Sequence, residues 1–232
     1  MITLREELDQ RIAKHDLLCH PFYVAWTKGQ LSQDDLRAYA QQYFHQVAAF
    51  PEYLETFENR SQGYSPALSQ VVANNRAEEE GADLPDGRPH AEMWLDFAEG
   101  MGAERATVGA TTPLPEVENL VNTFQRIVRE GSAAEALAAF YAYESQVPRI
   151  AREKARGLTE MYGASRSTCA YFTHHQTADV YHSLVWSEEL EKQVNADPAM
   201  REAALDTAET IAKALWHALD GIEVERMARA AA

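Results

Sequence analysis

Apolar residues recur along almost the whole chain with the period of an α-helix, and no stretch alternates apolar and polar residues as a half-buried strand does. Local start signals agree with this period. Thr3 and Glu6 have the spacing of a capping box, and Ser32 stands as an N-cap before a long periodic segment. The pattern therefore predicts an all-α protein.

The periodic segments and their breakers divide the chain into nine predicted helices. In chain order they cover residues 3–15, 20–29, 33–60, 66–80, 90–102, 115–131 and 132–161, a segment that contains 171–182, and 198–219. We expect Pro51 to kink or interrupt the third helix and Pro148 to kink the seventh, because proline lacks the helical hydrogen-bond donor. No linker long enough to separate domains lies between these segments, so residues 1–232 are predicted to form a single helical bundle.

The charge balance excludes two classes of partner. The chain has 21 Lys and Arg residues against 36 Asp and Glu, a net charge of −15, so nucleic acid and anionic membrane surfaces would repel it. Cys19 and Cys169 are too few for a disulfide framework, and no apolar run approaches the ~20 residues of a membrane span. We therefore expect a cytoplasmic protein that binds neither nucleic acid nor membrane.

The segment YFTHHQTADVYH, residues 171–182, sets His175, Asp179 and His182 at intervals of four and three. At about 100° per residue on a helix these three side chains share one narrow stripe, whereas His174 points roughly 100° away. Two imidazoles and a carboxylate on one stripe are ligands that a divalent metal ion accepts. The alternative is a polar helix face whose histidines bond to neighbouring groups.

Other predicted helices offer partners for this stripe. Glu144 lies in ALAAFYAYESQV, a small and apolar run in which an unpaired carboxylate would be costly to bury. The fourth helix ends in Glu78, Glu79 and Glu80, and His90 begins the fifth; a solvated acidic end and a capping or core histidine are the alternatives. Helical bundles commonly hold two iron or manganese ions between such residues. Three carboxylates bring about −3 of charge against two divalent ions, and mixed N and O ligands suit iron or manganese better than zinc.

Four longer stretches closely resemble one known family: HPFYVAWTKGQLSQDDLRAYAQQYF, AFPEYL, YAYESQVPRIAREKARGLTEMYG and AYFTHHQTADVYH. Over roughly residues 8–220 the chain resembles the Chlamydia protein associating with death domains (CADD) family and its bacterial relatives. These belong to the heme-oxygenase-like diiron oxidase group, and the PqqC and TenA families are more distant cousins. The resemblance implies a heme-oxygenase-like helical bundle with a dinuclear metal site inside.

The resemblance also implies a set of metal ligands. Carried over residue by residue, the family's ligands fall on Glu78, His90, Glu144, His175, Asp179 and His182. The family usually has a Glu followed seven positions later by His, whereas GADLPDGRP lengthens that gap to twelve here. Glu79 therefore remains an alternative to Glu78.

CADD-like proteins are self-sacrificing oxygenases that make p-aminobenzoate for folate synthesis from one of their own tyrosines, with a lysine implicated as amino donor. The matching residues are Tyr23 and Lys154, and three further tyrosines match aromatic positions near the family's site: Tyr39, Tyr43 and Tyr143. The resemblance implies two divalent metals, Fe/Fe or Fe/Mn, together with O2 and an external reductant; a homodimer is an expectation from symmetry preferences. Lys154 lies ten residues after Glu144, so on a straight helix it would need a bend to reach the metals.

Three other functions stay open. A diiron oxygenase acting on a free small molecule would have the same ligands, and a metal-free PqqC-like or TenA-like enzyme would use only a helical pocket. Neither Cys19 nor Cys169 has a context that matches the TenA nucleophile. A non-enzymatic helical interaction protein would leave the six candidate ligands unexplained.

Overall fold

The computed structural model describes residues 2–63 and 65–231. Within these residues the chain is nearly all helical and no strand occurs, which confirms the predicted all-α class. No helix in the same ranges is both long and apolar enough to cross a lipid bilayer. In chain order the elements are α1 (Leu4–Ile12), the short 3₁₀ helices η1 (Ala13–His15) and η2 (Leu17–Cys19), α2 (Pro21–Thr27), α3 (Gln33–Ser61), α4 (Pro66–Glu79), α5 (His90–Gly100), α6 (Arg105–Val108), α7 (Pro115–Glu130), α8 (Ala133–Glu144), α9 (Val147–Met161), α10 (Ala170–Ala196) and α11 (Met200–Ala230).

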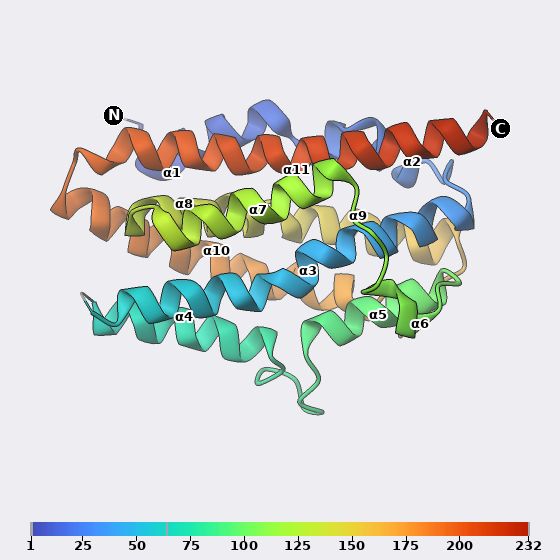
Figure 1. Cartoon of the computed structure of the whole chain (residues 1–232), viewed down its shortest axis with the longest axis horizontal. Helices are drawn as coiled ribbons and strands as arrows, with labels where there is room; N and C mark the ends of the chain where they lie inside the picture. Colours follow the sequence, from blue (N-terminus) through green and yellow to red (C-terminus); the bar gives the residue numbers. More distant parts are fainter. Residues whose placement is uncertain (1, 64, 232) are drawn as a thin grey trace.

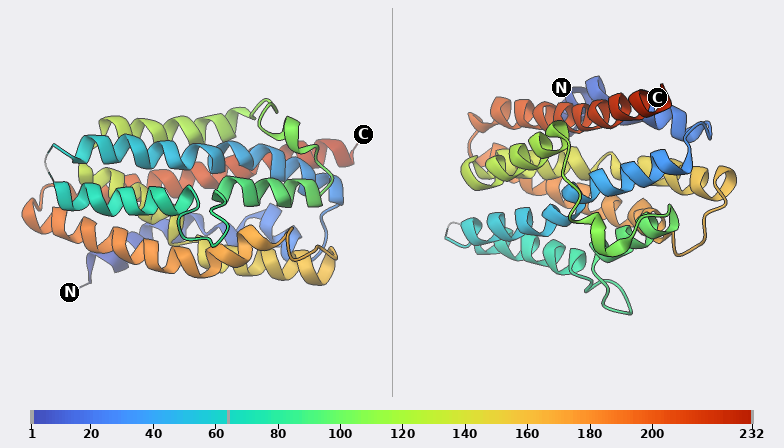
Figure 2. Two further views of the ribbon diagram at one scale, coloured as in Figure 1. Left: turned by 90° about the horizontal axis from the view of Figure 1, so that it is seen from below. Right: turned by 45° about the vertical axis from the view of Figure 1, so that its right-hand side comes forward.

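The long helices run side by side along the long axis of the molecule (Figures 1 and 2). α11 packs against α7 and α8, α10 packs against α8 and α9, and α3 packs against α4 and α7. Every residue of α8 from Ala136 to Glu144 is buried. A helix that is apolar on all sides is stable only when other helices surround it. Packing of α8 therefore brings Tyr143 and Glu144, at its C-terminal end, into the interior.

The segment 132–161, predicted as one helix, is divided into α8 and α9. The break falls at Ser145 and Gln146, ahead of Pro148, which stands in the first turn of α9. Proline lacks an N–H and crowds the turn before it, so a helix ends upstream of it and restarts where proline is tolerated. The bend expected at Pro148 is thus a break between two helices.

Three other boundaries differ from the prediction. α3 continues through Pro51, so of the predicted kink or interruption the interruption is wrong; the helix packs against α4, α5 and α7, which holds it on both sides of Pro51. The connector 104–114 contains the short helix α6. α11 extends to Ala230 rather than ending near Leu219, because its buried face continues to Ile222.

α2 and α9 approach each other closely where Gly157 faces Trp26. A Cβ atom added at Gly157 would lie 2.9 Å from Cδ1 of the Trp26 indole, closer than real Cβ contacts. The same indole donates a hydrogen bond from Nε1 to the carbonyl oxygen of Lys154, at 3.4 Å. The missing side chain at Gly157 therefore lets the helix that carries Tyr23 lie against the helix that carries Lys154.

We expect Gly157→Ala to lower the melting temperature, although alanine favours a helix over glycine by up to about 1 kcal/mol. Forcing a methyl group into a packed contact typically costs about 1–3 kcal/mol, which outweighs that gain. Thermal unfolding followed by circular dichroism measures the change. Gly63→Ala is the control, because an added Cβ there meets no atom of the described residues within 4 Å. A melting temperature for Gly157→Ala at or above that of the wild type would contradict the expected overlap.

Candidate metal centre

Six buried side chains form two groups of potential metal ligands, and a third, partly exposed set, Asp83, His90 and His174, shares His90 with the first. The first group is Glu79, His90 and His175, and the second group is Glu144, Asp179 and His182. Within each group one ligand atom from every residue lies within 4.8 Å of the others. A small hollow, with free space of about 10 Å³, is lined by residues of both groups, which are Glu79 and His175 from the first and Glu144 and Asp179 from the second. The two groups thus face one shared space.

α10 supplies ligands to both groups. It buries His175, Asp179 and His182, while Val180 and Tyr181 on its other side are 57% and 63% exposed. The four-and-three spacing therefore turns these three side chains inward, as predicted from the sequence. His175 joins the first group and the other two join the second, so one helix spans the whole centre.

The structure distinguishes the two acidic residues that the sequence left as alternatives. Glu79 is buried at the end of α4, and its Oε2 lies 3.1 Å from Nδ1 of His90. Glu78 lies outside both groups with its side chain 32% exposed, and its Oε2 is 2.5 Å from Nε2 of His182. Glu79 is therefore a member of the first group. Glu78 belongs to neither group and contacts His182 of the second group from outside.

Glu144 carries a buried oxygen that the protein itself does not satisfy. The residue is 1% exposed, and its Oε2 accepts a hydrogen bond from Nε1 of Trp186. Its Oε1 has no hydrogen-bond partner among the described residues and lies 3.9 Å from Nδ1 of His182. Burial raises the pKa of this carboxyl well above its usual range, although His182 opposes the rise. A buried carboxylate oxygen without a partner is costly, and a bound cation would remove that cost.

The histidines show how the centre balances charge. Burial alone would lower the pKa of His90, but Glu79 and Asp83 raise it to about 9. Burial likewise opposes protonation of His182, yet Asp179, Glu144 and Glu78 raise its pKa to about 10. Protons on these rings therefore neutralise the carboxylates when no cation is bound. Divalent ions would replace those protons, since metal ligands must be deprotonated.

His175 is oriented by the backbone instead. Its Nδ1 lies 2.7 Å from the carbonyl oxygen of Tyr171, one helical turn earlier, and the Tyr171 ring stacks on the imidazole at 4.0 Å. A carbonyl can only accept, so Nδ1 carries the hydrogen and Nε2 keeps a free lone pair. This is the arrangement that a metal-binding histidine needs. The donor set as a whole, three imidazoles and three carboxylates, fits two iron or manganese ions.

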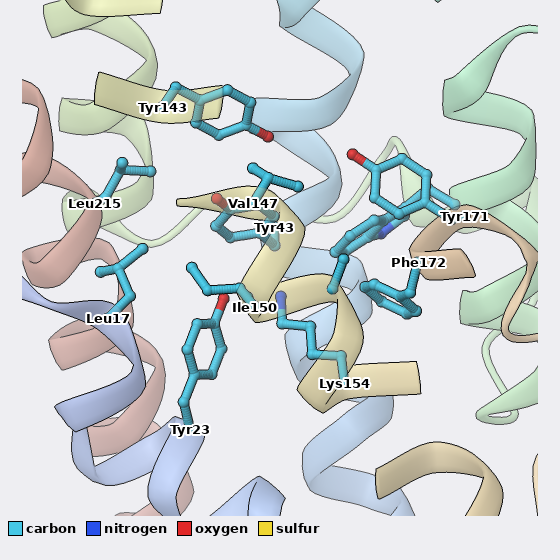
Figure 3. Close-up of a pocket in the computed structure, with 12 residues that line it drawn as sticks. Leu17, Tyr23, Tyr43, Tyr143, Val147, Ile150, Lys154, Tyr171, Phe172 and Leu215 are labelled. Atoms are coloured by element: carbon cyan, nitrogen blue, oxygen red, sulfur yellow. The ribbon is translucent and has the colours of Figure 1, made fainter. Parts of the chain in front are cut away.

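A second, aromatic cavity, with free space of about 30 Å³, shares the lining residues Tyr143 and Tyr171 with the hollow; Figure 3 shows it. Its wall is formed by Leu17, Tyr23, Tyr43, Trp94, Tyr143, Val147, Ile150, Ala151, Lys154, Tyr171, Phe172 and Leu215. The amine of Lys154 and the hydroxyl of Tyr23 both point toward its middle. Lys154 Nζ is 4.5 Å from the centroid of the Tyr23 ring and donates a hydrogen bond to Oη of Tyr39 at 2.5 Å. Oη of Tyr39 also lies 3.0 Å from Oη of Tyr23.

Burial controls the protonation of both groups. Lys154 is 5% exposed, and loss of hydration lowers the pKa of its amine well below the usual value. Burial also raises the pKa of the Tyr23 phenol well above 10, while the hydrogen bond with Tyr39 opposes this. Burial therefore favours the neutral forms of both groups, and a neutral amine has a lone pair available as a nucleophile.

Two tyrosines connect the aromatic cavity to the ligand groups. Tyr143 and Tyr171 line both the hollow between the groups and the cavity that holds Tyr23 and Lys154. Tyr143 was among the tyrosines predicted to lie near the site, whereas Tyr171 was not. The available signal was spacing: Tyr171 precedes His175 by one helical turn and so shares its face. Tyr43 also lines the cavity.

The chain is similar to proteins of one family over most of its length. The family model described as iron-containing redox enzyme matches residues 37–216. A 4-aminobenzoate synthase from Nitrosomonas europaea is 37% identical over 228 residues, which cover 95% of this chain and 91% of that protein. A 4-aminobenzoate synthase from Chlamydia trachomatis is 35% identical, over 93% of this chain and 90% of that one. The crystal structure of a CADD-like protein from Nostoc punctiforme superposes with a TM-score of 0.76 at 19% identity, covering 96% of both chains, which shows a shared fold.

Proposed function

We propose, from the premise that the chain belongs to the iron-containing redox enzyme family, that it is a metal-dependent oxygenase which forms p-aminobenzoate from its own Tyr23. Its similarity to curated 4-aminobenzoate synthases confirms the resemblance to the CADD-like proteins predicted from the sequence. One observation carries the proposal beyond the family. Tyr23 and Lys154 share a buried cavity whose wall includes Tyr143 and Tyr171, the residues that also line the ligand groups.

Two divalent ions, Fe/Fe or Fe/Mn, would be held by Glu79, His90, His175, Glu144, Asp179 and His182, and would supply the redox chemistry that activates O2. The three carboxylates of this set leave a small positive charge on the loaded centre, close to balance. Trp186 fixes one oxygen of Glu144 and so leaves the other facing His182 of the same group.

Tyr23 is the proposed source of the product skeleton. Its ring and β-carbon contain the seven carbons of p-aminobenzoate, so the Cα–Cβ bond breaks and the β-carbon is oxidised to the carboxyl group. O2 is the oxidant, and an external reductant supplies the remaining electrons. The hydrogen bond from Tyr39 and the packing of Phe22, which lies 6.1 Å away between ring centroids, hold the phenol in one orientation.

Lys154 is the proposed source of the nitrogen. Its amine lies over the Tyr23 ring, and burial favours the neutral form. Nitrogen takes the place of the phenol oxygen at the ring carbon opposite the β-carbon: the ring C–O bond breaks and that oxygen leaves as water. O2 then oxidises the Nζ–Cε bond to an imine, whose hydrolysis breaks this bond, frees the product amine and leaves an aldehyde on Cε. The cavity wall is mainly aromatic and aliphatic, so it keeps bulk water from competing with the amine. Tyr43, Tyr143 and Tyr39 are the phenols placed to pass electrons or protons between the centre and Tyr23.

The test is reconstitution of labelled, metal-free protein. Chains that carry ring-¹³C tyrosine and ¹⁵N lysine are loaded with Fe(II), or with Fe(II) and Mn(II), and then given reductant and O2. We expect at most one p-aminobenzoate per chain, with both labels in the product and a mass loss that peptide mapping assigns to Tyr23. Protein left without metal is the control and should form none. Product that carries no label from the chain, or formation without metal, would contradict the proposal.

A second candidate function is oxidation of a free small molecule in the same cavity. Mainly apolar walls with a few convergent polar groups are typical of a small-molecule site, although the free space of about 30 Å³ means that the walls must move apart to admit a substrate. Steady formation of a product far beyond one equivalent per chain, with Tyr23 intact, would favour it. The metal-free TenA-like alternative has less support, because Cys19 is exposed, Cys169 is buried elsewhere, and neither lines the cavity.

A further inference from the structure

Two acidic residues that belong to neither buried ligand group each contact one histidine of a group. The contact is at Nε2, the ring nitrogen that faces away from the carboxylates of that group. Asp83, in the loop between α4 and α5, has both carboxylate oxygens 3.3 Å from Nε2 of His90. Glu78, in the last turn of α4, has Oε2 at 2.5 Å from Nε2 of His182. Glu78 lies at the C-terminal end of α4 and Asp83 just after it. Neither is a member of the two buried groups, but Asp83 forms a third, partly exposed set of possible ligands with His90 and His174.

The His90 ring lies between two carboxylates. Its Nδ1 is 3.1 Å from Oε2 of Glu79 in the first group, and its Nε2 is the nitrogen that faces Asp83. The ring is completely buried, so neither nitrogen is in contact with bulk solvent. Asp83 also lies 2.9 Å from Nε2 of His174, which places this carboxylate between two imidazoles.

The His182 ring repeats the arrangement in the second group. Its Nδ1 is 3.3 Å from Oδ1 of Asp179 and 3.9 Å from Oε1 of Glu144, the oxygen without a hydrogen-bond partner. Its Nε2 faces Glu78. In both groups, therefore, Nδ1 points to the inner carboxylates and Nε2 to an outer one.

We propose that Asp83 and Glu78 are positioning residues, each accepting the Nε2 hydrogen of a group histidine and thereby directing the Nδ1 lone pair of that ring at the metal. The inference rests on the metal centre proposed above. A carboxylate accepts only, so it selects the tautomer with hydrogen on Nε2, fixes the plane of the ring and makes Nδ1 a stronger donor. Glu78 thus acts through His182, while Glu79 is the ligand from the same helix end.

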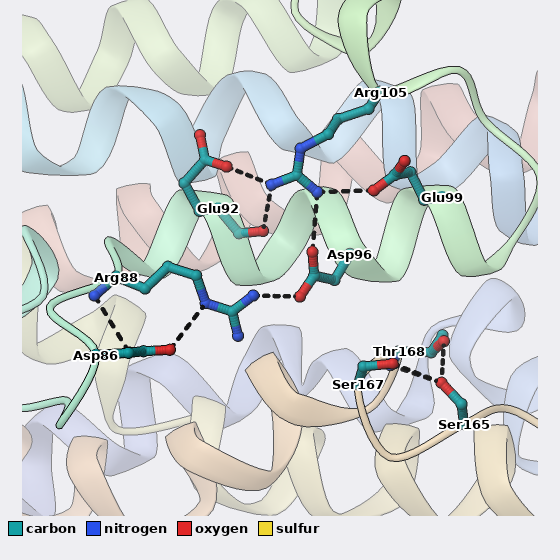
Figure 4. Close-up of polar contacts among 9 residues, drawn as sticks. All are labelled: Asp86, Arg88, Glu92, Asp96, Glu99, Arg105, Ser165, Ser167 and Thr168. Atoms are coloured by element: carbon teal, nitrogen blue, oxygen red, sulfur yellow. Dashed lines mark hydrogen bonds and ion pairs between the residues drawn. The ribbon is translucent and has the colours of Figure 1, made fainter.

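The loop is built to hold Asp83 in place. Gly81 has φ of 104°, and a Cβ atom there would lie 2.5 Å from the carbonyl oxygen of Gly87, so the loop closes tightly on itself. The guanidinium of Arg88 bonds to Asp96 on α5, as Figure 4 shows, and ties the loop to the helix that begins with His90. The long gap before His90 is therefore an ordered segment that supplies a carboxylate.

Metal binding tests the inference without the oxygenase reaction. Metal-free wild type, Asp83→Ala, Asp83→Asn and Glu78→Ala are titrated anaerobically with Co(II) against a chelator, and the ligand-field spectrum is recorded. Matched controls are Asp86→Ala, a change in the same loop, and Glu80→Ala, a change at the same helix end. Glu79→Ala is the comparison for loss of a ligand. Thermal unfolding of each metal-free protein shows whether the chain folds.

We expect the wild type to bind two Co(II) ions per chain. Asp83→Ala and Glu78→Ala should also bind two ions. Each should lower the affinity for one of them by about 10- to 100-fold and alter its spectrum, as loss of a hydrogen-bond partner behind a metal ligand does. Asp83→Asn keeps an acceptor oxygen and should lose less affinity for Co(II) than Asp83→Ala. Both matched controls should bind Co(II) like the wild type.

Two results would overturn the inference while leaving the centre intact. One is wild-type affinity and spectrum in Asp83→Ala and Glu78→Ala. The other is complete loss of one ion in Glu78→Ala with two ions retained in Glu79→Ala, which would make Glu78 the ligand. Failure of the wild type to bind Co(II), Fe(II) or Mn(II) would instead remove the metal centre, and the proposed function with it.

Discussion

Tyr23→Phe is expected to abolish p-aminobenzoate formation by the metal-loaded protein while metal uptake stays at the wild-type level. The substitution removes only the hydroxyl group, at the ring carbon where nitrogen is proposed to enter. Tyr23 lines the aromatic cavity and belongs to neither ligand group, so the metal ligands remain in place. The lost hydrogen bond with Tyr39 costs about 1 kcal/mol of stability, which leaves the fold intact. Mass spectrometry of the product and of the Tyr23 peptide, together with metal analysis, measures both outcomes.

Tyr53→Phe is the matched control for this variant. Tyr53 is also buried, and its hydroxyl donates a hydrogen bond to Gln46 at 3.2 Å, but it does not line the cavity. This control should form product in the wild-type amount. p-Aminobenzoate from Tyr23→Phe without added substrate would refute Tyr23 as the source.

Lys154→Met is expected to abolish the ¹⁵N-labelled product and, at the same time, to raise the free energy of unfolding at neutral pH. Burial lowers the pKa of the folded amine well below the unfolded value of about 10.5, so the unfolded chain binds one proton that the folded chain does not. At pH values below the folded pKa, each pKa unit of difference between the unfolded and folded states destabilises the wild type by about 1.4 kcal/mol. Methionine has a similar shape and no charge, so it removes this cost.

The pH dependence gives the sign of this effect. The stability advantage of Lys154→Met over the wild type should be largest below the folded pKa of Lys154 and should vanish as the pH rises to about 10.5, where the unfolded lysine also loses its proton. Urea unfolding of both metal-free proteins at a series of pH values measures the difference. Other titrating groups, His90 and His182 among them, cancel in this comparison because both proteins contain them. Lys192→Met, a change at an exposed lysine paired with Glu189, should show no such trend.

Wild-type product yield from Lys154→Met would exclude this lysine as the nitrogen source. A stability advantage that grows with rising pH would show that the folded amine is charged. Loss of product together with gain of stability would instead show that burial of Lys154 is kept for chemistry, at a cost to the fold.

Local features of the helices could be predicted from the sequence. Helical period and caps predicted most of the elements, and the four-and-three spacing predicted that α10 turns three ligands inward. These predictions succeed because a helix relates residues within a few turns by a constant rotation. The breaks were predicted less well: Pro148 ends a helix and Pro51 does not, because packing of α3 on its neighbours overrides the local preference.

For the candidate site too, the sequence predicted some features and missed others. The residue types and their resemblance to a known family indicated a dinuclear centre, and Tyr23 and Lys154 beside it. Spacing did not distinguish Glu78 from Glu79, since adjacent helical residues differ by about 100° and either face can turn inward. Asp83 was not predicted either, because a loop aspartate shows no periodic signal.

By itself, then, the sequence determined the all-α class, the family and a set of candidate ligands. Only the tertiary structure decided that Glu79 joins His90 and His175, that outer carboxylates face the Nε2 atoms of two histidines, and that Lys154 lies over the Tyr23 ring. The last contact joins residues on α2 and α9, and the close approach of those helices at Gly157 brings it about. Helix formation depends on neighbours along the chain, whereas these contacts depend on how whole helices pack.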